Sequence, residues 1–137
     1  MYEPEEIKEF PLPQAERGEG NEGMKIEGAA KRINIYIGHS DRWHGQPLYN
    51  AIVQRARQEG LAGASVVQGI EGFGANSRVH TASLLDLSTD LPIKIEIVDT
   101  AERIERFLPL LDEMVTEGLI TIEDCEVIKY VHDPSGR

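Results

Sequence analysis

The chain has 137 residues, of which 40% are hydrophobic and 28% charged, and this composition is typical of one globular domain. Its formal net charge of −10 argues against nonspecific binding to nucleic acid, which needs a basic surface. No apolar run approaches the roughly 20 residues of a membrane-spanning helix, so we expect no membrane insertion. Cys125 is the only cysteine, which excludes an internal disulfide and favours a cytoplasmic location.

The N-terminal segment, residues 1–23, differs in composition from the rest of the chain. It holds seven glutamates against Lys8 and Arg17, together with several prolines and glycines. It shows no sustained hydrophobic period and lacks the basic and apolar runs of a secretory signal. We therefore predict a flexible acidic tail over 1–23 and a compact domain over 24–137.

Two successive patterns predict the first strand and the first helix. Residues Arg32–Gly38 alternate apolar and polar side chains, which is typical of a half-buried strand. A polar turn over 39–45 follows, and Pro47 suits the first turn of a helix, where its missing N–H costs nothing. Gly60 has the position of a helix-ending glycine, so the first helix is expected between these two residues.

The second strand, Ala64–Ile70, is separated from the third by a long polar stretch. The third strand, Ile93–Val98, again alternates isoleucine with charged residues. The intervening loop has roughly 20 residues, and loops of that length in compact domains are usually functional or mobile. Its second half is expected to extend the third strand as a hairpin arm, on the evidence of Leu84, Leu85 and Leu87.

The C-terminal third of the compact domain predicts a helix and a last strand. Asp99 or Thr100 is suited to cap the helix, whose apolar residues recur at helical spacing. Pro109 falls inside that pattern and is expected to kink or divide the helix. The last strand is expected over Glu126–Val131, after the short apolar run Leu119–Ile122.

The order of these elements is strand, helix, strand, strand, helix, strand. This order is that of the α+β ferredoxin-like (βαββαβ) arrangement, an antiparallel sheet with both helices on one face. The other face of such a sheet is exposed in a single subunit.

A glycine cluster at the end of the second strand is the first candidate site. Gly69, Gly72 and Gly74 allow close approach of another group, and their N–H groups are candidate donors to an anion. Arg78 and His80 follow in the long loop, where a guanidinium and an imidazole suit phosphate or carboxylate. The alternatives are a glycine-rich bulge and a solvated loop.

The turn before the first helix gives a second candidate. His39, Asp41 and His44 offer imidazole and carboxylate groups, which are suitable ligands for a divalent transition metal. Their spacing is not diagnostic, and a polar turn with exposed side chains explains the same residues.

No pattern of catalytic residues is recognisable, so we expect neither enzymatic activity nor a cofactor. The serines lack the motif of an activated nucleophile. Cys125 is expected to face the core and to act there as a small apolar residue.

Several local sequences together resemble a known family. These are Leu48-Tyr49, Gly60-Leu61-Ala62-Gly63-Ala64, Gly69-Ile70-Glu71-Gly72-Phe73-Gly74, Asp90-Leu91-Pro92-Ile93 and Glu117-Gly118-Leu119-Ile120-Thr121. Through them, residues 28–131 resemble the domain of unknown function 190 family, which is related to the PII-like signal transduction proteins.

The resemblance implies a ferredoxin-like subunit assembled as a homotrimer. In PII-like trimers, clefts between subunits bind small molecules, often adenine nucleotides. A long loop between the second and third strands, the T-loop, responds to the ligand and contacts a partner protein. The matching segment of this chain is Gly72–Asp90.

The chain departs from PII proteins proper after the second helix. Those proteins carry a Gly-Asp-Gly-Lys type phosphate loop there, whereas this chain reads Thr116-Glu117-Gly118-Leu119-Ile120-Thr121. A triphosphate would meet Glu117 where it needs cations, which argues against ATP binding in the PII manner.

The leading hypothesis is a PII-like regulator that binds a small anionic ligand, such as an adenine nucleotide, at intersubunit clefts of a homotrimer. Gly69, Gly72, Gly74, Arg78 and His80 are its expected ligand-binding residues, and an unknown target protein is expected to contact the loop 72–90. The alternative is a divalent-metal-binding trimer, resembling the cation tolerance proteins of this fold, that uses His39 and His44.

Overall fold

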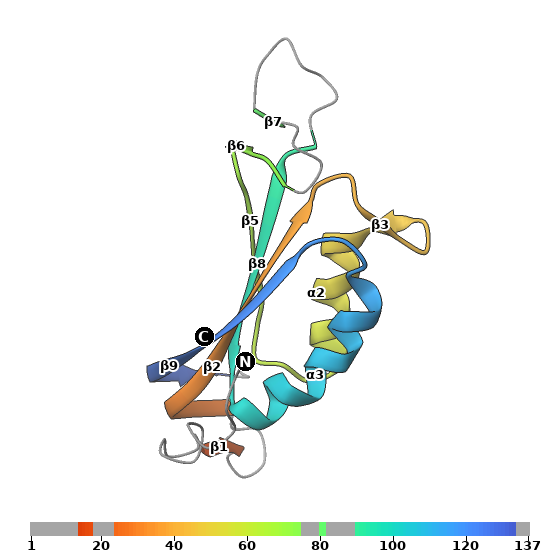
Figure 1. Ribbon diagram of the computed structural model, residues 1–137. Coiled ribbons are helices and arrows are strands. Elements are labelled where there is room, and N and C mark those ends of the chain that lie inside the picture. The colour runs from red at the N-terminus through yellow and green to blue at the C-terminus, as the bar shows by residue number, and fades with distance from the viewer. Residues whose placement is uncertain (1–13, 18–23, 75–79, 82–89, 134–137) are drawn as a thin grey trace.

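A computed structural model describes residues 14–17, 24–74, 80–81 and 90–133 of the chain. Four strands are paired antiparallel in the order β9-β2-β8-β5, and both helices lie against one face of this sheet (Figure 1). This arrangement confirms the predicted ferredoxin-like fold. The bounds of these elements are β2 Met24–Gly38, α2 Leu48–Gln58, β5 Ser65–Gln68, β8 Pro92–Asp99, α3 Ala101–Met114 and β9 Leu119–Val131.

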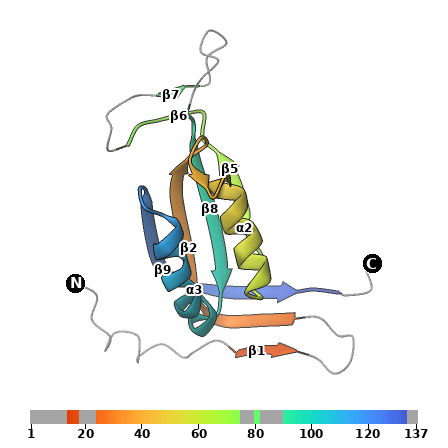
Figure 2. The same ribbon diagram turned by 90° about the vertical axis from the view of Figure 1, so that its right-hand side faces the viewer.

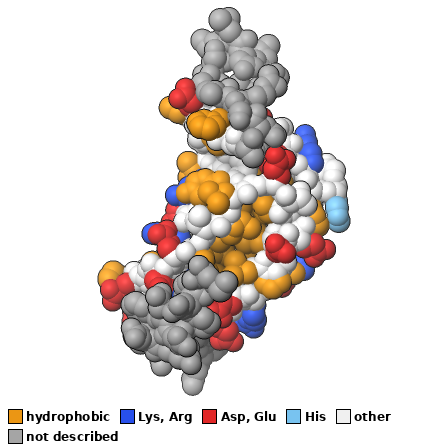
Figure 3. Space-filling model, viewed as in Figure 1, with side chains coloured by type: hydrophobic (Ala, Val, Ile, Leu, Met, Phe, Trp, Pro, Cys, Tyr) orange, Lys and Arg blue, Asp and Glu red, His pale blue; other side chains and the backbone are white. Residues whose placement is uncertain are grey.

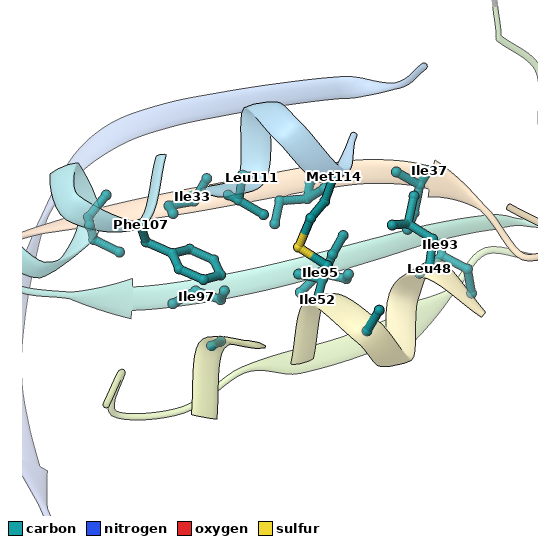
Figure 4. Close-up of a cluster of buried hydrophobic side chains, with 14 residues drawn as sticks. Ile33, Ile37, Leu48, Ile52, Ile93, Ile95, Ile97, Phe107, Leu111 and Met114 are labelled. Atoms are coloured by element: carbon teal, nitrogen blue, oxygen red, sulfur yellow. The ribbon is translucent and has the colours of Figure 1, made fainter. Parts of the chain in front are cut away.

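The core lies between the sheet and the two helices. Alternate residues of β2 and β8 point to this side, and their isoleucines stand directly opposite one another, as Ile35 and Ile95 do. The helices contribute the facing side chains, with Phe107 and Leu111 from α3 and Ile52 from α2 almost completely buried (Figure 4). Burial of these apolar side chains is the main favourable term in holding the helices to the sheet.

The ends of the helices have the predicted signals. Gly60 has a positive φ of 81° and donates its N–H to the carbonyl of Arg57, while Leu61 donates to Ala56, which is a Schellman ending. Thr100 caps α3 by accepting a hydrogen bond from the N–H of Arg103 at 3.3 Å. Pro109 does not divide the helix, since α3 runs unbroken through it, and the alternative of a kink stays a prediction.

Two strands are longer than predicted because both turn a corner. β2 begins at Met24 instead of Arg32, and β9 is one strand from Leu119 instead of two short runs. The pairing between them shifts between Ile26 and Gly28, where Gly28 has a φ of 92°. A bulge of this kind lets paired strands bend together. Figure 2 shows the first part of β2 and the last part of β9 crossing below the main sheet.

Part of the predicted tail belongs to this bent ribbon. Residues Gln14–Arg17 form β1, which pairs antiparallel with the first residues of β2. The flexible tail over 1–23 stays a prediction, because 1–13 and 18–23 lie outside the described residues.

Two small hairpins complete the described part. Arg42–Trp43 (β3) pairs with Gln46–Pro47 (β4), and Glu71–Gly72 (β6) pairs with His80–Thr81 (β7). Among the residues that the structure describes, none of the helices is long and apolar enough to cross a membrane.

Candidate functional site

The long loop 72–90 leaves and re-enters the sheet at one place, the beginning of β8. On one side, Gly69 donates its N–H to the carbonyl of Pro92 at 2.7 Å. On the other side, His39 donates its N–H to the carbonyl of Leu91 at 2.8 Å, and Ser40 donates to Asp90 Oδ1 at 2.7 Å. The segment Asp90–Pro92 therefore fixes the base of the loop between the ends of β5 and β2.

Two glycines of the cluster, Gly69 and Gly72, pack closely against Pro92. A Cβ on Gly69 would stand 2.7 Å from Pro92 Cγ, and one on Gly72 would stand 3.0 Å from it. A side chain at Gly69 would thus overlap the proline ring, and one at Gly72 would be tighter than ordinary contact. None of the three candidate glycines has a positive φ, so close approach explains Gly69 and Gly72 better than backbone freedom does.

The glycines differ in what they leave available to a ligand. The N–H of Gly69 is bonded to Pro92, so this predicted donor is already used within the fold. Gly72 lies in β6 opposite His80 of β7, and a Cβ on Gly74 would meet nothing within 4 Å. Gly72 and Gly74 therefore remain the candidate backbone donors.

The structure describes neither of the two predicted side chains of the site. Arg78 lies outside the described residues, as do Leu84, Leu85 and Leu87 of the predicted hairpin arm. For His80 the structure gives the backbone pairing with Gly72 and not the side chain. Their roles stay predictions.

Two further residues, Gly38 and Asp41, support the base of the loop. Gly38 is the last residue of β2 and packs against Asp90. A Cβ on Gly38 would stand 2.6 Å from Asp90 Oδ2. Asp41 Oδ2 accepts the N–H of Gly38 at 2.9 Å, which holds the same turn from the other side. A strand-ending glycine and two turn aspartates were visible in the sequence, but their convergence depends on the fold.

The turn histidines do not converge on a metal. His39 stacks on Tyr49 with ring centroids 5.6 Å apart, while His44 stacks on Trp43 at 4.1 Å. Oδ2 of Asp41 accepts the backbone N–H of Gly38. Within the described part of the chain no three His, Cys, Asp or Glu side chains are grouped to hold a metal ion. The predicted site at His39 and His44 is not supported.

A network of charged side chains occupies the sheet face away from the helices. Arg32 Nε donates to Glu123 Oε1 at 2.7 Å, and Asn34 Nδ2 donates to the same oxygen at 3.0 Å. These bonds lower the pKa of Glu123, and the bond to Glu123 raises the pKa of Arg32. Glu96 lies 3.9 Å from Arg32 and 3.7 Å from Lys94.

Cys125 is half-buried in β9, and burial raises the pKa of its thiol. A raised pKa keeps the thiol protonated near neutral pH, and the thiolate is the nucleophilic form. Cys125 therefore lacks the environment of a reactive cysteine.

Comparison with known proteins finds one family model and close relatives. The model for DUF190, described as "Uncharacterized ACR, COG1993", matches residues 30–127. A UPF0166 protein of Methanocaldococcus jannaschii is 41% identical over 101 residues, which cover 73% of this chain and 93% of that protein. A UPF0166 protein of Aquifex aeolicus is 37% identical over 98 residues, covering 72% of this chain and 92% of that protein.

Two solved structures share the fold at low sequence identity. CPII, a nitrogen regulatory PII-like protein from Thiomonas intermedia K12, superposes with a TM-score of 0.51 and 17% identity, over 72% of this chain and 88% of that one. CutA from Synechococcus elongatus gives a TM-score of 0.50 and 10% identity, over 81% of this chain and 87% of that one. Both likenesses concern the fold alone.

Proposed function

The chain belongs to the DUF190 family, and we propose that it is a non-enzymatic PII-like regulator that binds a small anionic ligand at clefts between the subunits of a homotrimer. The observation that carries this proposal is the base of the loop 72–90. Both ends of that loop are held on Asp90–Pro92 by backbone hydrogen bonds and by glycines packed against Pro92. Such a base keeps the loop's ends fixed while the loop itself exchanges contacts.

The ligand would meet the loop where it leaves this base. Gly72 and Gly74 supply backbone N–H groups, Arg78 supplies a planar fork of donors, and His80 adds a polar contact. Binding there biases the loop between two states and so changes its contact with a target protein in the cytoplasm.

A fold neighbour supports this choice of ligand class. The CPII structure is bound to ADP, AMP and bicarbonate, all of which are anions. In our proposal this chain takes a ligand of the same kind, and a nucleoside mono- or diphosphate is favoured over a triphosphate. A triphosphate is disfavoured because of Glu117, which adds negative charge to the turn after α3. The corresponding turn of PII proteins carries their phosphate loop.

Titration calorimetry with the full chain tests the proposal directly. AMP, ADP, ATP and bicarbonate are titrated separately, and zinc is included as the probe for the metal alternative. We expect saturable binding of AMP, ADP or bicarbonate near one site per subunit and no binding of zinc. Heat from zinc alone would contradict the proposal and favour a metal-binding protein.

The role of Arg78 is tested by a matched pair of variants. Arg78→Ala is expected to weaken anion binding at least tenfold, because the guanidinium is the only cation assigned to the ligand. Arg57→Ala, on the exposed side of α2, removes the same charge elsewhere and is expected to leave binding unchanged. Equal affinity in both variants would remove Arg78 from the site.

A further inference from the structure

The short strand β6 and the residues beside it present exposed apolar side chains where the long loop begins. β6 lies beyond the ends of both helices, which therefore do not cover it (Figures 1 and 2). Phe73, directly after β6, is 75% exposed, and Ile70, directly before it, is 79% exposed. Single exposed apolar residues are common on protein surfaces. Two of them at the base of a candidate binding loop indicate a place where another molecule is bound.

Gly74, the residue after Phe73, is a glycine for which the described residues give no packing reason. A Cβ on Gly74 would meet nothing within 4 Å, and the φ of Gly74 is not positive. At Gly69 and Gly72, by contrast, a Cβ would crowd the ring of Pro92. A glycine with open space around it leaves the backbone accessible to close approach by a ligand.

The chain on either side of Phe73 leaves its ring accessible. Gly72 and Gly74 have no side chains that could lie over the ring. The backbone at Gly72 is held by its pairing with His80 of β7 and by its packing against Pro92. Phe73 is therefore an aromatic side chain on a backbone that the fold positions, and such a ring can stack on another planar ring.

The polar groups next to Phe73 indicate where the anionic part of a ligand would lie. Glu71, in β6, is exposed, and its carboxylate repels a phosphate. The N–H of Gly74, on the other side of Phe73, is a candidate donor in open space. An anionic group is therefore expected at Gly74 and not at Glu71.

We propose that Phe73 stacks on the base of a nucleotide whose phosphate is bound at the N–H of Gly74. This inference rests on the proposed function and deepens it, because it selects a nucleotide over bicarbonate or phosphate alone as the ligand. A planar apolar ring next to an accessible N–H fits a molecule with a planar ring and an anionic end. Phe73 is then the residue that determines specificity for the base, whereas Gly74 contacts the anionic group.

Titration calorimetry of the full chain with AMP and with ribose 5-phosphate separates the two contacts, because ribose 5-phosphate lacks the base. We expect wild type to bind AMP at least about fivefold more tightly than ribose 5-phosphate. In Phe73→Ala the affinity for AMP is expected to fall to that for ribose 5-phosphate, which itself stays unchanged.

Two further substitutions at Phe73 separate stacking from general apolar contact. Phe73→Leu keeps an apolar side chain without the ring and is expected to lose the preference for AMP, whereas Phe73→Trp is expected to keep it. Ile128→Ala removes an apolar side chain of β9 that is 81% exposed, and it is expected to leave both affinities unchanged. A preference for AMP that survives Phe73→Ala and Phe73→Leu would overturn the stacking role.

Gly74→Ala tests the approach of the ligand to the backbone. The added methyl group meets nothing within the described part of the chain, so the free energy of unfolding is expected to stay unchanged. The methyl group stands where the ligand would lie, and binding of both AMP and ribose 5-phosphate is expected to weaken. Gly63→Ala, where a Cβ also meets nothing within 4 Å, is expected to change neither stability nor binding. Unchanged binding in Gly74→Ala would overturn the role of Gly74.

Failure of this inference is distinguishable from failure of the proposed function. Equal affinity of wild type for AMP and ribose 5-phosphate contradicts recognition of the base and leaves a site for anions standing. Absence of binding by AMP, ribose 5-phosphate and bicarbonate contradicts both. A change in the sedimentation coefficient of Phe73→Ala, with the preference for AMP retained, would show that Phe73 contacts protein instead of a base, and would overturn the inference.

Discussion

Gly69 and Pro92 lie so close that a single methyl group on the glycine would stand 2.7 Å from the proline ring. The same two residues are joined by a hydrogen bond from the Gly69 N–H to the Pro92 carbonyl. The contact links the end of β5 to the beginning of β8 across the long loop. It therefore sets the separation of the loop's two ends. Figure 3 shows hydrophobic side chains exposed next to the upper grey segment. Ile70 and Phe73 are the exposed apolar residues of this stretch.

Gly69→Ala is expected to lower the free energy of unfolding by about 2 kcal/mol, since the methyl group forces the proline ring or the backbone to shift. Chemical denaturation followed by circular dichroism measures this change. Gly63→Ala is the matched control, because a Cβ on Gly63 would meet nothing within 4 Å and its φ is not positive. Equal stability of the two variants would show that the contact is looser than described.

Asp99 gives the second prediction, since its carboxylate is fully buried at the junction of β8 and α3. It accepts the N–H groups of Ala62 at 2.8 Å and Thr100 at 2.7 Å, and Arg103 Nη1 lies 3.5 Å away. Asp99→Ala leaves these donors with fewer acceptors and is expected to cost about 3 kcal/mol of stability.

Thermal unfolding followed by circular dichroism checks that expectation. Asp112→Ala, an exposed substitution on α3, is expected to change the unfolding temperature little. A small effect at Asp99 as well would mean that water replaces its hydrogen bonds.

The central fold could be predicted from the sequence because its signals are local. The isoleucines of β2 and β8 alternate with polar residues, and Gly60 marks the end of α2 within its own turn. Each of these signals depends on neighbours in the chain. The bend at Gly28 could not be predicted in this way. It follows from the pairing of β2 with β9, which lies about a hundred residues later in the chain.

The candidate site was found in part for the same reason. The glycine cluster was visible, but its purpose depends on Pro92, which lies beyond the long loop. In the sequence Asn34 was one polar position of an alternating strand, and only the fold shows its hydrogen bond to Glu123 and the Oδ1 that lacks a partner among the described residues. The histidines of the turn suggested a metal, whereas the fold directs each onto an aromatic neighbour.

Gly28 carries the third prediction. Its φ of 92° is unfavourable for a residue with a side chain, while a Cβ there would meet nothing within 4 Å. The cost of Gly28→Ala is therefore conformational, about 1–2 kcal/mol. Denaturant unfolding measures the loss, with Gly63→Ala again as control. No loss would indicate that β2 and β9 reach their bend with Gly28 in another conformation.

The last prediction concerns the pKa of Glu123. The hydrogen bonds from Arg32 and Asn34 lower it below its ordinary value of 4.5. A carboxyl group whose pKa is lower in the folded state stabilises the fold above its unfolded pKa, and this contribution is lost as the pH falls through the folded pKa. We therefore expect the contribution of Glu123 to disappear only below pH 4.5.

Nuclear magnetic resonance titration of the Glu123 side-chain carboxyl measures this pKa directly. In Arg32→Ala the strongest cause of the shift is gone, so the pKa is expected to move back toward 4.5. In Asn34→Leu, which removes the second hydrogen bond, a smaller return is expected, and Arg57→Ala should have none. An identical pKa for Glu123 in wild type and Arg32→Ala would show that the two side chains are not bonded in solution. The network on the sheet face away from the helices would then be unable to hold Asn34 in the orientation that leaves Oδ1 without a partner among the described residues.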